Sequence, residues 1–124
     1  MNKKKKLIGF RSNETVCLSV SNYLNGNLRL TLDYPDGSYC EEITVYTDEK
    51  LDMFTGYVRT FEIPEAINFI VSNKLGKRVK NNTLIINRCA SLLYEFNQEA
   101  LKSCDLLGYE RALQTYEKKK EAIV

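Results

Sequence analysis

The stretch LRLTLDYPDGSYCEEITVY, residues 28–46, decides the fold that the sequence predicts. Leucines alternate with polar residues over 28–33, which is the two-residue period of a strand with one buried face. The segment Pro35-Asp36-Gly37-Ser38 then predicts a turn, because proline presets φ, aspartate bonds back to the backbone and glycine accepts the left-handed conformation. The returning residues alternate again, so the stretch indicates a β-hairpin.

An earlier strand extends this hairpin into an antiparallel meander. Val16, Leu18 and Val20 alternate with polar residues, and Asn25-Gly26 is typical of a two-residue type I′ turn that leads into Leu28. On the returning strand we predict that Ile43 and Val45 are buried. The side chains predicted to form an exposed polar ladder on the other face are Arg29, Thr31, Asp33, Glu42, Thr44 and Tyr46.

The second half of the chain predicts helices and short strands. A helix is expected from Pro64 to Leu75, ended by Gly76 and packed on the apolar face of the meander. Short strands are expected over 56–61 and 83–86. Residues 92–96 fit a strand or a helix, and we favour a strand that ends before an N-cap at Asn97. Two helices are expected to follow: one through Cys104 and one from Gly108 that frays beyond Lys118.

These elements predict a single α+β domain over residues 1–124, with an antiparallel sheet of about five strands. One helix is packed on a face of the sheet, and two short helices end the chain. Residues 1–12 are expected to form a basic N-terminal arm and residues 118–124 a frayed C-terminus. Hydrophobic residues at 44% and charged residues at 27% are ordinary for a globular protein.

Neither a signal peptide nor a membrane span is expected, because the apolar run at Leu7–Phe10 is too short for either. We therefore expect a cytoplasmic protein whose four cysteines stay reduced. The cysteines form no C-x-x-C pair, and the chain contains no histidine to complete a mixed zinc site. We predict no metal, no cofactor and no catalytic residue. An enzyme remains an open alternative for which the sequence suggests no substrate.

The densest group of carboxylates suggests a binding surface for a protein partner. Glu41, Glu42, Asp48 and Glu49 lie on or beside the hairpin, together with Tyr46. An acidic sheet face of this kind could imitate a DNA backbone opposite a basic groove on the partner. The alternatives are an ordinary solvated surface and a site for a divalent cation.

A second hypothesis is a nucleic-acid-binding accessory module that contacts phosphates through lysine and arginine. Its candidate residues are Lys3, Lys4, Lys5 and Lys6 at the N-terminus, Lys77, Arg78 and Lys80 in a loop after the helix, and Lys118 to Lys120. Solvated chain ends and a polar loop are the alternative explanation for the same residues.

Over residues 16–116 the chain resembles an uncharacterised bacterial family catalogued as domain of unknown function 4313. The turn YLNGNL (23–28) and the segment LYEFN (93–97) carry the resemblance, while GYVRT (56–60) replaces a stretch rich in asparagine and aspartate that is common in the family. The resemblance implies a small protein of mobile genetic elements, and it favours a strand over 92–96. It implies no activity. From the residues and this resemblance together, we expect a non-enzymatic interaction protein that binds or inhibits a host defence protein. The sequence does not indicate its oligomeric state.

Overall fold

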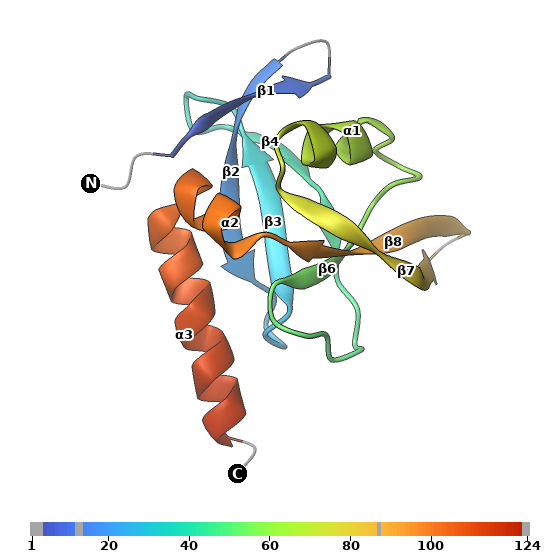
Figure 1. Cartoon of the computed structure of the whole chain (residues 1–124), viewed down its shortest axis with the longest axis vertical. Coiled ribbons are helices and arrows are strands. Elements are labelled where there is room, and N and C mark those ends of the chain that lie inside the picture. The colour runs from blue at the N-terminus through green and yellow to red at the C-terminus, as the bar shows by residue number, and fades with distance from the viewer. Residues whose placement is uncertain (1–3, 12–13, 87, 123–124) are drawn as a thin grey trace.

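The computed structural model describes residues 4–11, 14–86 and 88–122. Within these ranges the chain is α+β, with two four-stranded antiparallel sheets and three helices (Figure 1). The strands of sheet 1, in spatial order, are β1 (Lys6–Phe10), β2 (Glu14–Asn22), β3 (Leu28–Asp33) and β4 (Tyr39–Glu42). Those of sheet 2 are β5 (Thr44–Val45), β6 (Thr55–Val58), β8 (Cys89–Phe96) and β7 (Gly76–Ile86). The helices are α1 (Glu65–Ser72), α2 (Gln98–Cys104) and α3 (Leu106–Ala122).

The prediction of one sheet with about five strands is wrong, because the returning strand of the hairpin changes sheets at Ile43. The Ile43 amide still donates to the Leu30 carbonyl of β3 at 3.1 Å, but Thr44 pairs with Val58 of sheet 2. Thr44 was predicted to be exposed, yet it is 0% exposed. Its hydroxyl accepts a hydrogen bond from the Leu30 amide at 3.0 Å, in place of the carbonyl that a continuing strand would offer.

The loops between β2 and β3 and between β3 and β4 each have three residues, so the predicted type I′ turn is also wrong. In the first loop the Tyr23 amide donates to the Asn27 carbonyl at 2.8 Å, and the Gly26 amide donates to the Tyr23 carbonyl at 2.9 Å. Gly26 has a φ of 94°. The loop over 34–38 repeats this pattern, with Gly37 at a φ of 91°. A turn that ends in a left-handed glycine is the common three-residue hairpin loop.

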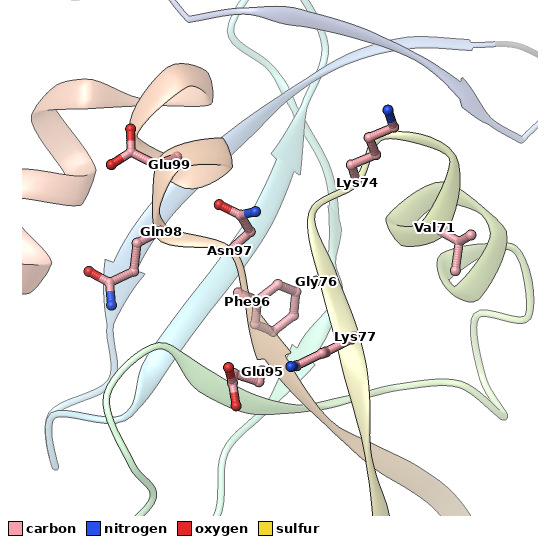
Figure 2. Close-up of a pocket in the computed structure, with 9 residues that line it drawn as sticks. All are labelled: Val71, Lys74, Gly76, Lys77, Glu95, Phe96, Asn97, Gln98 and Glu99. Carbon is pink, nitrogen blue, oxygen red and sulfur yellow. The ribbon is translucent and has the colours of Figure 1, made fainter.

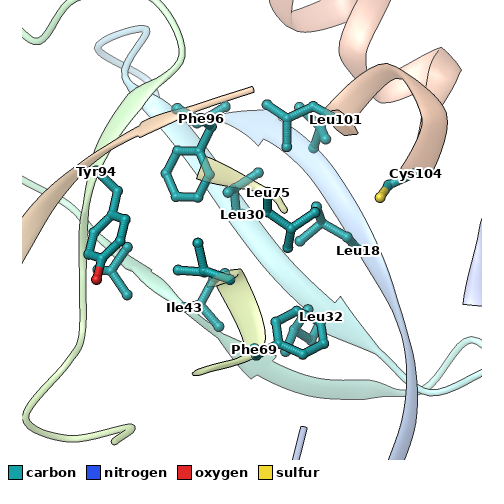
Figure 3. Packing of buried hydrophobic residues seen from close by; sticks show 14 of the residues in the cluster. Leu18, Leu30, Leu32, Ile43, Phe69, Leu75, Tyr94, Phe96, Leu101 and Cys104 are labelled. Carbon is teal, nitrogen blue, oxygen red and sulfur yellow. The ribbon is translucent and has the colours of Figure 1, made fainter. Parts of the chain in front are cut away.

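The core lies on the predicted face of β2 and β3 (Figure 3). All six apolar residues of the alternating pattern are buried there: Val16, Leu18, Val20, Leu28, Leu30 and Leu32. Helix α1 adds Ala66, Phe69 and Ile70 to the same cluster. The ring of Phe69 meets the ring of Phe10 edge-on, with 5.5 Å between centroids. Strand β1, which carries Phe10, lies inside the segment predicted to be a basic arm.

Strand β7 begins where a loop was predicted. Gly76 was expected to end the helix, but it pairs with Phe96, and a Cβ atom there would lie 2.7 Å from the Glu95 carbonyl oxygen. The close approach of β8 therefore requires glycine. The predicted loop over 77–80 is also wrong, because Lys77 and Arg78 pair with β8 and the strand continues through residue 80, although the ladder is interrupted after Arg78. The chain leaves α1 instead through Lys74, which has a φ of 53°.

The C-terminal elements occur in the predicted order, but β8 and α3 are longer than predicted. Strand β8 is confirmed, and the Asn97 side chain accepts a hydrogen bond from the Ala100 amide at 3.1 Å as the N-cap of α2. Helix α3 has 17 residues and extends to Ala122. It is therefore not the short helix that was predicted. It begins at Leu106, before the predicted start, because the preceding aspartate caps it.

That aspartate, Asp105, connects α3 to sheet 1. Its side chain is buried, and its Oδ1 accepts from the Gly108 amide at 3.1 Å while its Oδ2 accepts from the Val20 amide of β2 at 2.9 Å. A Cβ atom on Gly108 would lie 2.4 Å from the Val20 carbonyl oxygen. Further along α3, the Tyr116 hydroxyl accepts from the Phe54 amide at 3.3 Å. The helix is therefore fixed to both sheet 1 and the loop before β6.

Candidate functional site

Glu42 was predicted to lie on an exposed acidic face, but it is held among cationic and hydroxyl groups. Its carboxylate lies 2.9 Å from Arg29 Nε and 3.4 Å from Arg59 Nη2. It also accepts a hydrogen bond from the Tyr23 hydroxyl at 2.7 Å. Only 17% of its side chain is exposed. Burial, and then the neighbouring carboxylate, raise the pKa of Tyr23, so this phenol stays protonated and donates to Glu42.

Glu41 points away from Glu42 and belongs to a different ion pair. Its carboxylate lies 3.0 Å from Arg11 Nη2, and Arg11 Nε lies 2.7 Å from Glu65 in the first turn of α1. The hydrogen bond from Arg11 holds the pKa of Glu65 below its ordinary value. Arg11 thus connects the end of β1 to both β4 and α1, and it neutralises part of the acidic charge.

The remaining acidic candidates lie in the loop between β5 and β6. The Tyr46 hydroxyl donates to Asp48 at 2.8 Å, and the Tyr57 hydroxyl donates to Glu49 at 3.1 Å. The bond to Asp48 raises the pKa of Tyr46, while burial and then Glu49 raise that of Tyr57. Asp48 and Glu49 are exposed. The structure therefore distributes the predicted acidic site over three separate networks.

The N-terminal lysines do not lie beside the other predicted cations. Lys4 Nζ donates to Ser19 Oγ at 2.5 Å and lies 3.8 Å from the Asp33 carboxylate. Lys5 and Lys6 are exposed on the side of β1. Lys3 lies outside the described residues. Because β1 belongs to sheet 1, these lysines belong to a different sheet from the cations of β7.

The cations of β7 are exposed and carry no ion pair with any described residue. These are Lys77, Arg78 and Lys80. Lys77 stands opposite Glu95 in the ladder with β8, so one carboxylate lies close to this group. Cationic side chains also protect the edge of a sheet against pairing with other chains.

Two exposed apolar side chains lie near the end of the β7–β8 hairpin, and we call Phe61 and Ile85 the hairpin-end patch. Ile86 is next in β7, so its side chain points to the opposite face of the sheet. Phe61 is 66% exposed and Ile85 is 70% exposed. The Phe61 amide donates to the Ala90 carbonyl at 3.3 Å, and Ile85 stands opposite Ala90. The sequence pattern did not indicate this patch. Its only local signal is Leu84-Ile85-Ile86, three consecutive apolar residues within the uncharged stretch 81–87, where apolar and polar residues do not alternate.

An open groove of about 620 Å³ lies between the end of α1, the start of β7 and the start of α2 (Figure 2). Lys74 and Lys77 line one side, and Glu95 and Glu99 line the other. Cations and carboxylates are thus present in equal number. The lining residues contain no serine or cysteine that could act as a nucleophile. The lining of the groove therefore suggests no reaction.

No group of three or more metal-binding side chains occurs in the part of the chain that the structure describes. The four cysteines are unpaired, and burial raises the pKa of the Cys104 thiol. A raised pKa makes a thiol less nucleophilic at neutral pH. Of the helices in the described ranges, none combines the length and the apolar character needed to cross a bilayer.

Comparisons with protein families, curated proteins and solved structures gave no match to this chain. The resemblance noted from the sequence therefore remains a prediction.

Proposed function

We propose that the chain is a non-enzymatic interaction protein that contacts a protein partner through the hairpin-end patch. The exposure of Phe61 and Ile85 carries this proposal. Each is a large apolar side chain with about two thirds of its surface in water, and both lie next to Ala90. Exposed apolar side chains that gather at one place are typical of protein–protein contacts, where aromatic residues often dominate the binding energy.

The acidic residues support a binding role less strongly than the sequence analysis expected. A surface that imitates DNA needs unpaired negative charge, whereas Glu41 and Glu42 are each bound to arginine. Asp48 and Glu49 are exposed and could contribute at the rim of an interface. We therefore propose an interaction surface at sheet 2 rather than at the acidic side of the hairpin.

The test is capture of partners by the tagged chain from a lysate of its source organism, with and without nuclease, read by mass spectrometry. The double variant Phe61→Lys/Ile85→Lys should lose a partner that the wild type retains, because charges replace the apolar contact. Leu24→Lys is the matched control, since Leu24 is 100% exposed in the loop between β2 and β3. The proposal is wrong if the double variant retains every partner, or if nuclease releases them all.

A second candidate function, nucleic-acid binding, is favoured by the unpaired cations Lys77, Arg78 and Lys80. If they contact phosphates, the logarithm of affinity should fall with the logarithm of salt, with a slope of about 0.9 per contact. The triple alanine variant should lower that slope by roughly two to three. An electrophoretic shift assay with duplex and single-stranded DNA measures this. No shift at low salt would exclude the candidate.

A further inference from the structure

The outer edge of β7 is open over its last four residues. Strand β7 is the border strand of sheet 2, and in Figure 1 the β7–β8 hairpin extends away from α3. Within the described chain, the backbone of residues 83–86 has hydrogen bonds only to β8. A border strand of this kind leaves a row of unpaired N–H and C=O groups, which is a template for another strand.

The register shows which backbone groups face outward. The Ala90 carbonyl accepts from the Phe61 amide at 3.3 Å, on the side of β8 that is away from β7. Residues that stand opposite each other in an antiparallel ladder exchange either both of their hydrogen bonds or neither. Ile85 stands opposite Ala90, so the N–H and C=O of Ile85 point out of the sheet. Those of Thr83, two residues earlier, point the same way.

The two halves of β7 differ in their protection against such pairing. The first half carries Lys77, Arg78 and Lys80, and the ladder with β8 is interrupted between Arg78 and Thr83. Cations and bulges are the devices by which border strands avoid pairing with other chains. The second half has neither, and its β-branched side chains favour an extended conformation. The open template is therefore confined to residues 83–86.

Charge decides which kind of strand fits this edge. Lys80 and Arg88 are exposed on either side of the open segment. Two copies of the chain could pair through this edge in antiparallel orientation, with Thr83 of one copy opposite Ile85 of the other. Lys80 of one copy would then stand opposite Arg88 of the other, and these like charges would repel. A segment with an apolar centre and acidic ends would instead place its carboxylates against these cations.

We propose that residues 83–86 of β7 bind an extended segment of a protein partner as an added strand, and that this segment carries acidic residues on both sides of a short apolar centre. The inference rests on the proposed function, because Ile85 belongs to the hairpin-end patch. Backbone hydrogen bonds from Thr83 and Ile85 supply the pairing, and the side chain of Ile85, on the border strand itself, supplies the apolar contact.

The test selects displayed random twelve-residue peptides on the wild-type protein and measures the best peptide by fluorescence anisotropy. We expect enrichment of β-branched residues flanked by aspartate and glutamate. Replacing the acids of the best peptide by lysine should weaken binding roughly tenfold or more. Enrichment of basic peptides, or of none, would overturn the proposal.

The variant Thr83→Pro tests the pairing itself, because proline removes an outward N–H while leaving Phe61 and Ile85 in place. Thr83→Ala is the matched control. Binding should be lost in Thr83→Pro and kept in Thr83→Ala. Should Thr83→Pro fail to fold, hydrogen exchange in the wild type provides the same answer. The peptide should slow exchange of the Thr83 and Ile85 amides, and protection elsewhere would contradict strand addition.

The outcomes for this inference and for the proposed function can be separated. In one outcome, the double variant Phe61→Lys/Ile85→Lys loses the partner while Thr83→Pro still binds the peptide fully. That combination would support the proposed interaction surface and overturn the added strand. A wild-type dimer in analytical ultracentrifugation that Thr83→Pro dissociates would show that a second copy occupies the edge. That result would overturn the acidic partner.

Discussion

The carboxylate of Asp105 is the contact whose removal has the clearest expected cost. Asp105→Ala removes the cap of α3, which is worth about 0.5–2 kcal/mol. It also leaves the Val20 amide, bonded to Oδ2 at 2.9 Å, without this acceptor in a buried position, at about 1–3 kcal/mol. Part of the two costs overlaps, so we expect a loss of roughly 2–4 kcal/mol. With a urea m-value near 2 kcal/mol/M, the unfolding midpoint should fall by about 1–2 M.

Urea unfolding followed by circular dichroism measures this loss. Glu110→Ala is the matched control, because Glu110 is an exposed carboxylate on the same helix, and its removal should change stability by less than about 0.5 kcal/mol. Asp105→Asn, which retains one acceptor oxygen, should fall between the two. If Asp105→Ala is no more destabilising than Glu110→Ala, the side chain does not connect α3 to β2 and our account of the C-terminal half is wrong.

Four further predictions concern stability. Leu30→Ala should lower the free energy of unfolding in urea by about 2–5 kcal/mol, as a buried large-to-small change does. Thr44→Val should lower it by about 1–3 kcal/mol, because the Leu30 amide loses its acceptor. For either variant, stability equal to that of the wild type would contradict the prediction. Gly76→Ala should lower the melting temperature more than Gly56→Ala, since its Cβ atom would lie 2.7 Å from a carbonyl oxygen, while a Cβ atom at Gly56 would have no neighbour closer than 3.4 Å. Burial raises the pKa of Tyr116 from 10.0 to about 12, so its contribution is complete below pH 10 and is lost as the pH rises toward 12. The urea midpoint of Tyr116→Phe should consequently fall less over that range than that of the wild type, and an equal fall would refute the reasoning.

Alternation of apolar and polar residues was enough to predict the register of β2 and β3. Each leucine from Leu28 to Leu32 takes the predicted face, because a one-residue slip would place all of them in water. The cap at Asn97 was predictable for a similar reason, since its hydrogen bond to Ala100 is local. Features that depend on neighbours close in sequence were therefore accessible without the structure.

The change of sheets at Ile43 was not accessible in this way. The alternating pattern continues unbroken through Thr44, and nothing local distinguishes a strand that remains in one sheet from one that enters another. The partners that decide it, Leu30 and Val58, are separated by 28 residues of the sequence. Residues whose partners come from a different sheet are where alternation alone assigns the wrong exposure.

The candidate site was misjudged for the same physical reason. Glu41 and Glu42 are adjacent acids in the sequence, but their counterions come from elsewhere: Arg11 directly follows β1, and Arg29 lies in β3. Conversely, Phe61 and Ile85 are far apart in sequence, and the ladder brings both beside Ala90. The number of charged or apolar residues in a stretch of sequence is thus a poor measure of how much charged or apolar surface the folded protein exposes there.

The contact between β2 and Asp105 also determines when, during synthesis, the free edge of β2 can be covered. Strand β1 pairs with β2 only as far as Cys17, and the Val20 amide finds its acceptor 85 residues later in the chain. Since synthesis proceeds from the N-terminus, a growing chain exposes this part of β2 until Asp105 has been made. A chain that ends before Asp105 leaves these backbone groups of β2 unpaired, and they can then pair with another chain. The C-terminal helix is therefore needed to keep sheet 1 from joining neighbouring chains while many copies are being made at once.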